Sequence, residues 1–293
     1  QINATGTVAS RALGIDFELG VWVGLVSILL CSMLGGMRAV TWTQVAQYIV
    51  LIIAYLIPVF WISNTLDYGI FPHFTLGNEV SQIAALEDKF GLVTNDKDAM
   101  AAMTFADGSK VEKLKYISTS HSGVPEGGMA AWKFISLALC MMVGTASLPH
   151  ILMRYFTTPS VKAARKSVAW SLFFIALLYT SAPMLATVSK LALMDPNLAT
   201  GIIGKSIAEV QNIDWYQAWN AQKWMHIQDF NSDGILDLNE FFMRGDIVVL
   251  ATPEIAGLPY VISGLVAAGG MAAAMSTADG LILAIANALS HDI

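Results

Sequence analysis

The stretch AVTWTQVAQYIVLIIAYLIPVFWISNTL, residues 39–66, contains no Asp, Glu, Lys or Arg. It is longer than the roughly 20 apolar residues that a helix needs to cross a bilayer. It shows neither the alternation of a half-buried strand nor the broad polar face of a soluble helix. We therefore interpret it as a transmembrane helix.

Four further runs without these charged residues have similar length. The chain as a whole is 55% hydrophobic and 13% charged, with a mean hydropathy of +0.59, whereas a soluble domain carries roughly a quarter charged residues. The sequence thus predicts an all-α membrane protein with five transmembrane helices, and it disfavours an ordinary soluble enzyme. The four further runs cover residues 19–37, 134–153, 167–189 and 255–278.

Charged residues predict the sidedness of these spans. The connection 154–166 holds four basic residues and no acid, whereas 67–131 and 190–254 each hold nine acids, against five and four bases. Basic residues concentrate in short cytoplasmic connections, so we expect the two acidic segments to be outer loops of a multi-pass protein of the plasma (inner) membrane. The N-terminal end then lies outside and the C-terminal end in the cytoplasm. The predicted organisation is 1–66, 132–189 and 255–293 in the membrane, with 67–131 and 190–254 outside.

The remaining composition limits the partners. The net charge is −6, which disfavours nucleic acid and leaves membrane lipid and a small solute. Cys31 and Cys140 both lie inside apolar runs, so neither a disulfide framework nor a cysteine zinc site is expected. Because the chain starts at Gln1 and no signal segment precedes the first span, we expect it to be part of a longer protein.

Polar residues within a span are costly in lipid, so they mark packed or aqueous interiors. The last span contains Ser276 and Thr277, followed by Asp279. Two hydroxyls and a carboxylate are oxygen ligands that an alkali cation accepts, although the hydroxyls can instead bond to carbonyls of the preceding turn. For Asp279 we expect a cation, proton or gating role, and the alternative is a role at the helix end.

The third span holds a second candidate site, the substrate-binding group Gly144, Thr145, Ala146 and Ser147. Pro149 removes a backbone donor and clashes with the preceding turn, and discontinuous helices are typical of transporter binding sites. A simple proline kink is the alternative. His150, near the cytoplasmic end, is interpreted as a packing or interfacial residue.

Polar side chains also enter the second span. Gly35 and Gly36 predict a tight turn between the first two spans, and Thr43, Gln44 and Gln47 follow on one helix. Taken alone, this pattern is weak.

The second outer loop contains the sharpest motif, DFNSDGILDLNE at residues 229–240. It matches the twelve-position EF-hand calcium loop, with residues 215–227 as the expected incoming helix. A chance match by an acidic surface loop is the alternative. A single EF-hand outside the cell is more consistent with a structural Ca²⁺ site than with a signalling switch. The expected calcium ligands are Asp229, Asn231, Asp233, Ile235, Asp237 and Glu240.

Three motifs together resemble the sodium:solute symporter family, most closely its cation/acetate symporter-like branch. They are GGMRAVTWT at 35–43, GTASLPHILMRYFT at 144–157, and AAMST at 273–277 with its continuation to HDI at 291–293. The resemblance implies a LeuT-like ten-helix core of two inverted repeats with alternating access, in which the five spans are core helices four to eight. It also implies that Ala273, Ser276 and Thr277 bind sodium, with partners on core helix one.

One departure from the family suggests a second cation site. Many members carry an acid after the Trp-Thr of helix five, where this chain has Gln44, whereas Asp279 stands where relatives often have a small hydroxyl residue. Our hypothesis is that the carboxylate of a second cation or proton site has moved between helices, so that Asp279 faces Gln44, beside Thr43.

The predicted function is sodium-coupled import of a small monocarboxylate such as acetate, with Na⁺ as the coupling ion and Ca²⁺ in the outer loop. No covalent chemistry is implied, so the protein is not expected to be an enzyme. The alternatives are symport of a sugar, proline or pantothenate, a transporter-like membrane sensor of a small solute, and a calcium-regulated transporter.

Overall fold

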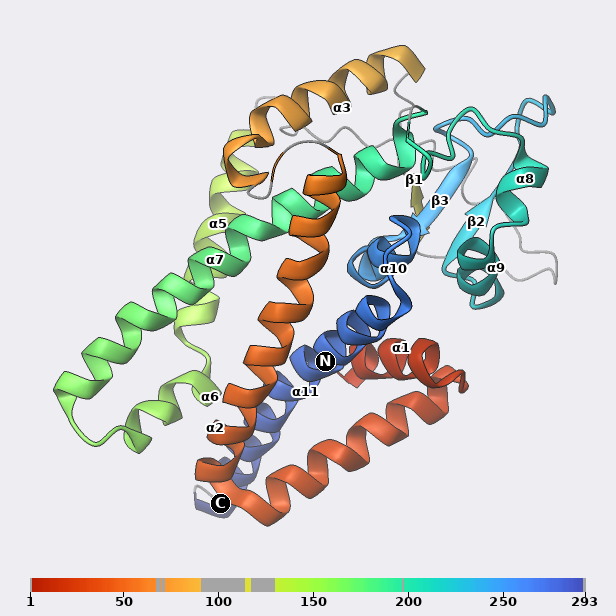
Figure 1. Cartoon of the computed structure of the whole chain (residues 1–293). Coiled ribbons are helices and arrows are strands. Elements are labelled where there is room, and N and C mark those ends of the chain that lie inside the picture. The colour runs from red at the N-terminus through yellow and green to blue at the C-terminus, as the bar shows by residue number, and fades with distance from the viewer. Residues whose placement is uncertain are drawn as a thin grey trace. The chain divides into compact units, whose positions relative to one another are not determined.

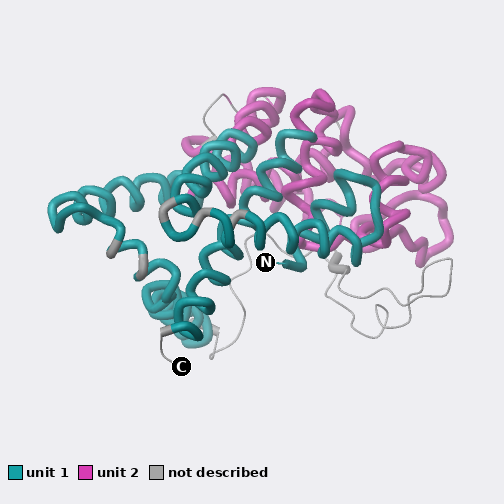
Figure 2. The backbone as a smooth tube through the Cα atoms, turned by 90° about the horizontal axis from the view of Figure 1, so that it is seen from below, with its two compact units in different colours: residues 1–55, 124–179, 264–293 teal, residues 56–123, 180–263 magenta. Residues whose placement is uncertain are grey.

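The computed structural model describes residues 2–66, 69, 72–90, 114–116, 130–196 and 198–291 (Figure 1). These residues form two compact units, which Figure 2 shows in different colours. The first comprises residues 1–55, 124–179 and 264–293, and the second 56–123 and 180–263. Three long helices, α2 (Phe17–Thr65), α7 (Val161–Met194) and α11 (Tyr260–His291), have residues in both units.

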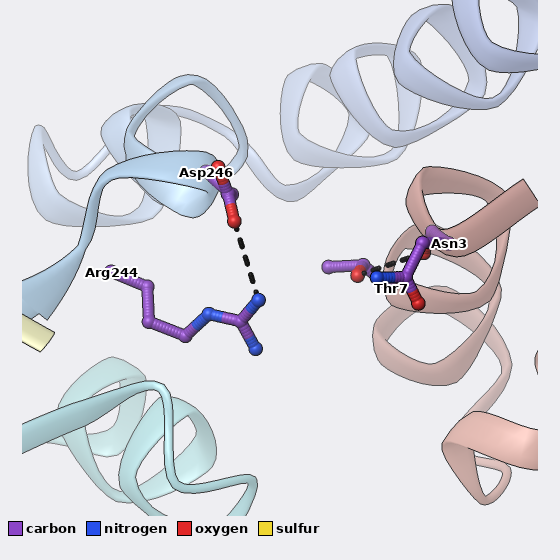
Figure 3. A network of polar contacts seen from close by, with 4 residues as sticks. All are labelled: Asn3, Thr7, Arg244 and Asp246. Atoms are coloured by element: carbon purple, nitrogen blue, oxygen red, sulfur yellow. Dashed lines mark hydrogen bonds and ion pairs between the residues drawn. The ribbon is translucent and has the colours of Figure 1, made fainter. Parts of the chain in front are cut away.

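All regular secondary structure among the described residues of the first unit is helical. Besides parts of the long helices it contains α1 (Ile2–Leu13), α5 (Ala130–Ala146), α6 (Pro149–Leu152) and the 3-10 helix η2 (Met153–Thr157). A Cβ at Gly24 of α2 would lie 2.5 Å from Thr5 Oγ1. Glycine therefore allows α1 and α2 to approach closely. Within α1, Thr7 Oγ1 donates to the Asn3 carbonyl at 3.1 Å (Figure 3).

The predicted turn between the first two spans is a kink inside α2, whose ribbon bends sharply part-way along (Figure 1). Gly36 has φ 56° and ψ −169°, whereas the rest of α2 is helical. Only glycine adopts this left-handed region without strain. The two spans are thus joined by one residue rather than by a loop.

Four of the five predicted spans are long apolar helices. The helical stretches long and apolar enough to cross a membrane are residues 17–34, 39–65, 161–194 and 260–290. The fifth predicted span, 134–153, is interrupted, because α5 ends at Ala146 and α6 begins at Pro149. Exposed apolar side chains along α5 and the first half of α7 form surface of the kind that contacts lipid or further protein.

The second unit adds a small sheet that the all-α prediction did not include. Its antiparallel strand order is β1 (Leu114–Tyr116), β3 (Phe241–Arg244), β2 (Met225–Ile227). The register pairs Lys115 with Met243 and His226 with Phe242. The other short helices described in this unit are η1 (Pro72–Phe74), α3 (Leu76–Phe90), α8 (Ile207–Gln211), α9 (Asp214–Ala221), η3 (Gly245–Ile247) and α10 (Val248–Ile255).

An apolar core holds this unit together. Trp219, Met225, Leu236 and Phe241 are fully buried in one cluster that continues to the C-terminal end of α7 and to α10. Burying a side chain of this kind contributes roughly 1.5–3 kcal/mol. At the edge of the cluster, Arg244 lies over the Trp224 ring, 5.8 Å from its centroid. Arg244 also donates to Asp246 at 3.2 Å (Figure 3).

Polar contacts attach residues 72–90 to α7. Lys190 of α7 forms a buried ion pair with Glu87 of α3, and His73 lies 3.3 Å from Ser181. Glu79 at the start of α3 is buried, and burial raises the pKa of its carboxyl despite a hydrogen bond from Thr75.

One local prediction in residues 190–254 was wrong. The incoming helix expected over 215–227 ends at Ala221, because Lys223 has φ 61° and residues 225–227 pair as a strand with β3. In residues 67–131, residues 81–90 are helical, within α3, and residues 114–116 form strand β1. Most of 67–131 lies outside the described part.

Candidate functional site

The candidate site is built on α11 where this helix meets α2. A Cβ at Gly269 would lie 2.6 Å from Ala54 Cβ of α2, so glycine is needed for the close approach of the two helices. Pro259 and Gly257 (φ 64°) separate α11 from α10. The predicted last span therefore starts at Tyr260 rather than at residue 255.

The three residues expected to bind sodium follow on α11. Ser276 Oγ donates to the Ala273 carbonyl at 3.0 Å, which is the bond to the preceding turn considered as the local alternative. This bond brings together two of the three expected oxygen ligands. Thr277 is half-buried on the next position.

Asp279 is fully buried two residues further along. Its Oδ1 accepts a hydrogen bond from Ser32 Oγ of α2 at 3.3 Å, and its Oδ2 has no hydrogen-bond partner among the described residues. α11 continues to His291, more than three turns beyond. Asp279 is thus an interior residue of the helix, and the alternative of a role at the helix end is wrong.

Gln44 reaches the same stretch of α11 from the second span. Its Nε2 donates to the Ser276 carbonyl at 2.5 Å, while its buried Oε1 has no partner in the described part of the chain. Positions 276 and 279 are three residues apart and so share one side of the helix. Thr43 does not join this group, because its Oγ1 donates to the Ala39 carbonyl of its own helix at 3.0 Å.

Sequence reasoning missed Ser32. The residue is a single hydroxyl in an apolar run, and such a serine usually bonds within its own helix. Because α2 bends at Gly36, both of its halves contact α11. Ser32, before the kink, bonds to Asp279, and Gln44, after the kink, bonds to the Ser276 carbonyl. In the sequence, only the paired glycines at 35 and 36 indicated that the chain bends here.

The predicted break in the third span is present at Ser147 and Leu148, between α5 and α6. Gly144 itself is still helical, and Pro149 occupies the first helical position after the break, where its missing N–H costs nothing. Thr145 Oγ1 donates to the Met141 carbonyl at 2.7 Å and Ser147 Oγ to the Gly144 carbonyl at 3.1 Å. The four expected substrate residues are exposed in this chain.

Two basic residues after the break pack against α11. A Cβ at Gly280 would lie 3.4 Å from His150 Cβ and 3.6 Å from Arg154 Nη2. His150 is 7% exposed, and its Nδ1 has no hydrogen-bond partner among the described residues. The prediction of a packing role for His150 agrees with this burial, whereas the contact of Arg154 had no signal in the sequence.

The loop 229–240 is flanked by strands β2 and β3 instead of helices. Asp229 accepts from the Ser232 and Gly234 N–H groups, Asp233 from Ile235, and Glu240 from Phe230 and Asp237, at 2.6–3.1 Å. Gly234 has φ 72°, as the sharp turn of the motif requires.

The Asn231 amide also fills part of this loop, because its Nδ2 donates to Asp233 and Asp237 at 3.0 and 3.2 Å. Within the described ranges no three His, Cys, Asp or Glu side chains are grouped so that they could hold a metal ion. The carboxylates point to backbone and amide donors of their own loop, and a cation would have to replace these donors.

Beside the loop, burial alters two titrating groups. It lowers the pKa of His226, against a hydrogen bond with Gln228 that raises it. It raises the pKa of Tyr216 to about 12.

Comparison with known proteins identifies a family and many similar proteins, two of which follow. The sequence model of the sodium:solute symporter family matches residues 1–209. An uncharacterized symporter of Cupriavidus necator is 39% identical over 363 residues, covering 100% of this chain and 52% of that protein. A monocarboxylic acid transporter of Corynebacterium glutamicum is 29% identical over 185 residues, covering 61% of this chain and 30% of that protein. The chain therefore spans about half or less of the length of these relatives, and no solved structure is significantly similar.

Proposed function

Because the chain belongs to the sodium:solute symporter family, we propose that it is the central part of a sodium-coupled importer of a small monocarboxylate such as acetate. The observation that carries this proposal is the pair of oxygens on α11, the Ala273 carbonyl and the Ser276 hydroxyl, 3.0 Å apart. The name of the Corynebacterium relative, a monocarboxylic acid transporter, supports the substrate class.

In this proposal sodium binds the Ala273 carbonyl and the Ser276 and Thr277 hydroxyls, and ligands from elsewhere in the protein complete its shell. The substrate binds at Gly144, Thr145, Ala146 and Ser147, where the break between α5 and α6 releases backbone groups from helical hydrogen bonds. Sodium and substrate each favour the same conformer, so sodium entry down its gradient drives uptake.

A second cation site at Asp279 is part of the proposal. A buried carboxylate without a counter-charge is costly, and a cation between Asp279 and the Gln44 Oε1 would satisfy two oxygens that have no partner in the described residues. Ser32, which donates to Asp279, belongs to the proposed site, whereas Thr43 donates to the Ala39 carbonyl of its own helix. We expect Asp279→Asn to change the number of cations transported per substrate. An unchanged stoichiometry and unchanged coupling would contradict this site.

The outer loop 229–240 is proposed to bind calcium as a structural ion, on the strength of its match to the twelve-position motif. The strands β2 and β3 hold the two ends of the loop together, with Gln228 N–H donating to the Glu240 carbonyl at 3.0 Å. Calcium would then replace the internal donors of the loop.

The decisive experiment measures uptake of labelled acetate into proteoliposomes that contain the full-length protein, with and without an inward sodium gradient. The test variant is Ser276→Ala/Thr277→Ala, and the matched control is Ser290→Ala, an exposed serine on the same helix. We expect sodium-driven uptake by the wild type and the control and its loss in the test variant. Absence of uptake for a panel of small carboxylates would refute the substrate class and redirect the search to sugars, proline or pantothenate.

A further inference from the structure

His150 and Arg154 converge on one point of α11 for which the proposed function gives no role. The point is Gly280, where a Cβ would lie 3.4 and 3.5 Å from His150 Cβ and Cδ2, and 3.6 Å from Arg154 Nη2. A Cβ there would make ordinary van der Waals contacts, so both basic side chains pack directly against α11 at Gly280.

Neither side chain has an anionic partner among the described residues. Arg154 is half-buried and forms no ion pair there, and the Nδ1 of His150 is buried without a hydrogen-bond partner. Asp279 is the neighbour of Gly280 in the chain, but it accepts its hydrogen bond from Ser32 of α2. A partly desolvated guanidinium without an anion is costly, so the arrangement is incomplete without a negatively charged group.

Other basic residues of the same connection do not share this setting. Lys162, Arg165 and Lys166 are exposed, as expected of charges whose role is to keep a loop in the cytoplasm. Arg154 differs from them because it packs against a transmembrane helix. Its position therefore calls for an explanation beyond membrane sidedness.

We infer that Arg154 and His150 form a second binding site for the carboxylate group of the transported substrate, separate from the site proposed at residues 144–147 and on the cytoplasmic side of the sodium site. This inference rests on the proposed function, because it concerns the same substrate. The guanidinium fork matches a carboxylate through two parallel hydrogen bonds, and the imidazole adds a further polar contact beside it.

The site also explains how the substrate and sodium can be linked. Gly280 lies four residues after Ser276, which is about one turn of helix. The carboxylate bound at Gly280 would thus lie one turn from the proposed sodium ligands, close enough for the anion and the cation to attract one another in a poorly solvated interior. Release of sodium to the cytoplasm then weakens the hold on the substrate.

The test compares the KM for labelled acetate at the two faces of the membrane, in inside-out and right-side-out vesicles that contain the full-length protein. We expect Arg154→Gln to raise the KM at the cytoplasmic face about tenfold, the effect of losing one charge-assisted contact. The KM at the outer face should change by less than about twofold. Arg154→Lys keeps the charge but cannot form the two parallel hydrogen bonds of a guanidinium. Its cytoplasmic KM should therefore lie between those of the wild type and of Arg154→Gln.

Two matched pairs control the experiment. Lys162→Gln removes an exposed charge of the same connection and should leave both KM values unchanged. Gly280→Leu places a bulky side chain against His150 and Arg154 and should raise the cytoplasmic KM, whereas Gly264→Leu, at a position of α11 with open space around it, should not.

The outcomes separate this inference from the function on which it rests. A wild-type protein without carboxylate transport overturns both. Transport by the wild type together with an unchanged cytoplasmic KM in folded Arg154→Gln overturns the carboxylate site alone. If Arg154→Gln does not fold, Arg154→Lys and Gly280→Leu decide, and a cytoplasmic KM within about twofold of the wild type in both overturns the site.

Discussion

Lys190 and Glu87 form an ion pair whose side chains are 8% and 3% exposed. Removing one partner of a buried pair leaves an uncompensated charge and typically costs about 3–5 kcal/mol, whereas replacing both by apolar residues is often close to neutral. We expect Lys190→Met to destabilise the second unit by that amount and Lys190→Met/Glu87→Leu to restore most of the loss. Denaturant unfolding of the purified full-length protein, followed by tryptophan fluorescence, measures both. Equal loss in the single and double variants would show that the contact is not electrostatic.

At this scale the sequence predicted the residues whose chemistry is unusual for their surroundings. Asp279 and Gln44 stand out because a carboxylate and an amide are rare in apolar runs, and the structure places both on the face between α2 and α11. Ser32 and Arg154 were missed, because a serine in a helix or an arginine near a span end has a common local explanation. Only the contacts across helices distinguish them.

Strand β2 of the small sheet carries a group sensitive to pH. Burial lowers the pKa of His226 on β2, so between that lowered pKa and its ordinary 6.5 the unfolded chain binds a proton that the folded chain does not. Stability from this group is complete above pH 6.5 and is lost as the pH falls through this window. Glu79 has the opposite sign, because its raised pKa gives stability that is lost as the pH rises.

We therefore expect the wild type to lose stability relative to His226→Gln as the pH is lowered from 7.5 to 5. Thermal unfolding of both proteins across this range measures the difference, in which the contribution of Glu79 cancels. A difference that does not vary with pH would contradict the assignment to His226.

The loop between β2 and β3 gives a further prediction. If it binds calcium, about 5 mM Ca²⁺, a concentration suited to weak extracellular sites, should raise the unfolding temperature of the wild type. Glu240→Gln, which removes the expected bidentate ligand, should abolish the rise, and Glu209→Gln, an exposed acid on α8, should not. If Ca²⁺ still raises the unfolding temperature of Glu240→Gln, or does not raise that of the wild type, the loop matches the EF-hand motif only by chance.

Helices and strands were easier to predict from the sequence when they contained a long run of apolar residues. The long charge-free runs became α2, α7 and α11, because a bilayer-spanning helix needs many consecutive apolar residues. The strands have three or four residues each, and β1 pairs with a strand far away in the chain. Such short segments carry no periodicity of their own, and their conformation depends on the partner.

Across the molecule, the proposed sidedness places residues 154–166 in the cytoplasm and 190–254 outside. We expect Lys162→Cys and Gln211→Cys, both at exposed positions, to react differently with a membrane-impermeant maleimide in intact cells that carry an otherwise cysteine-free protein. Gln211→Cys should be labelled directly, and Lys162→Cys only after permeabilisation. The reverse pattern would invert the orientation, and with it the face on which the Arg154 site opens.

The single non-helical residue inside α2 has a consequence for biosynthesis. The two spans joined at Gly36 leave the ribosome in immediate succession, because no long hydrophilic loop separates them. They are therefore expected to enter the lipid as one hairpin. Ser32 and Gln44, on opposite sides of the bend, then enter the membrane interior together. Their hydrogen-bond partners on α11 are synthesised only later.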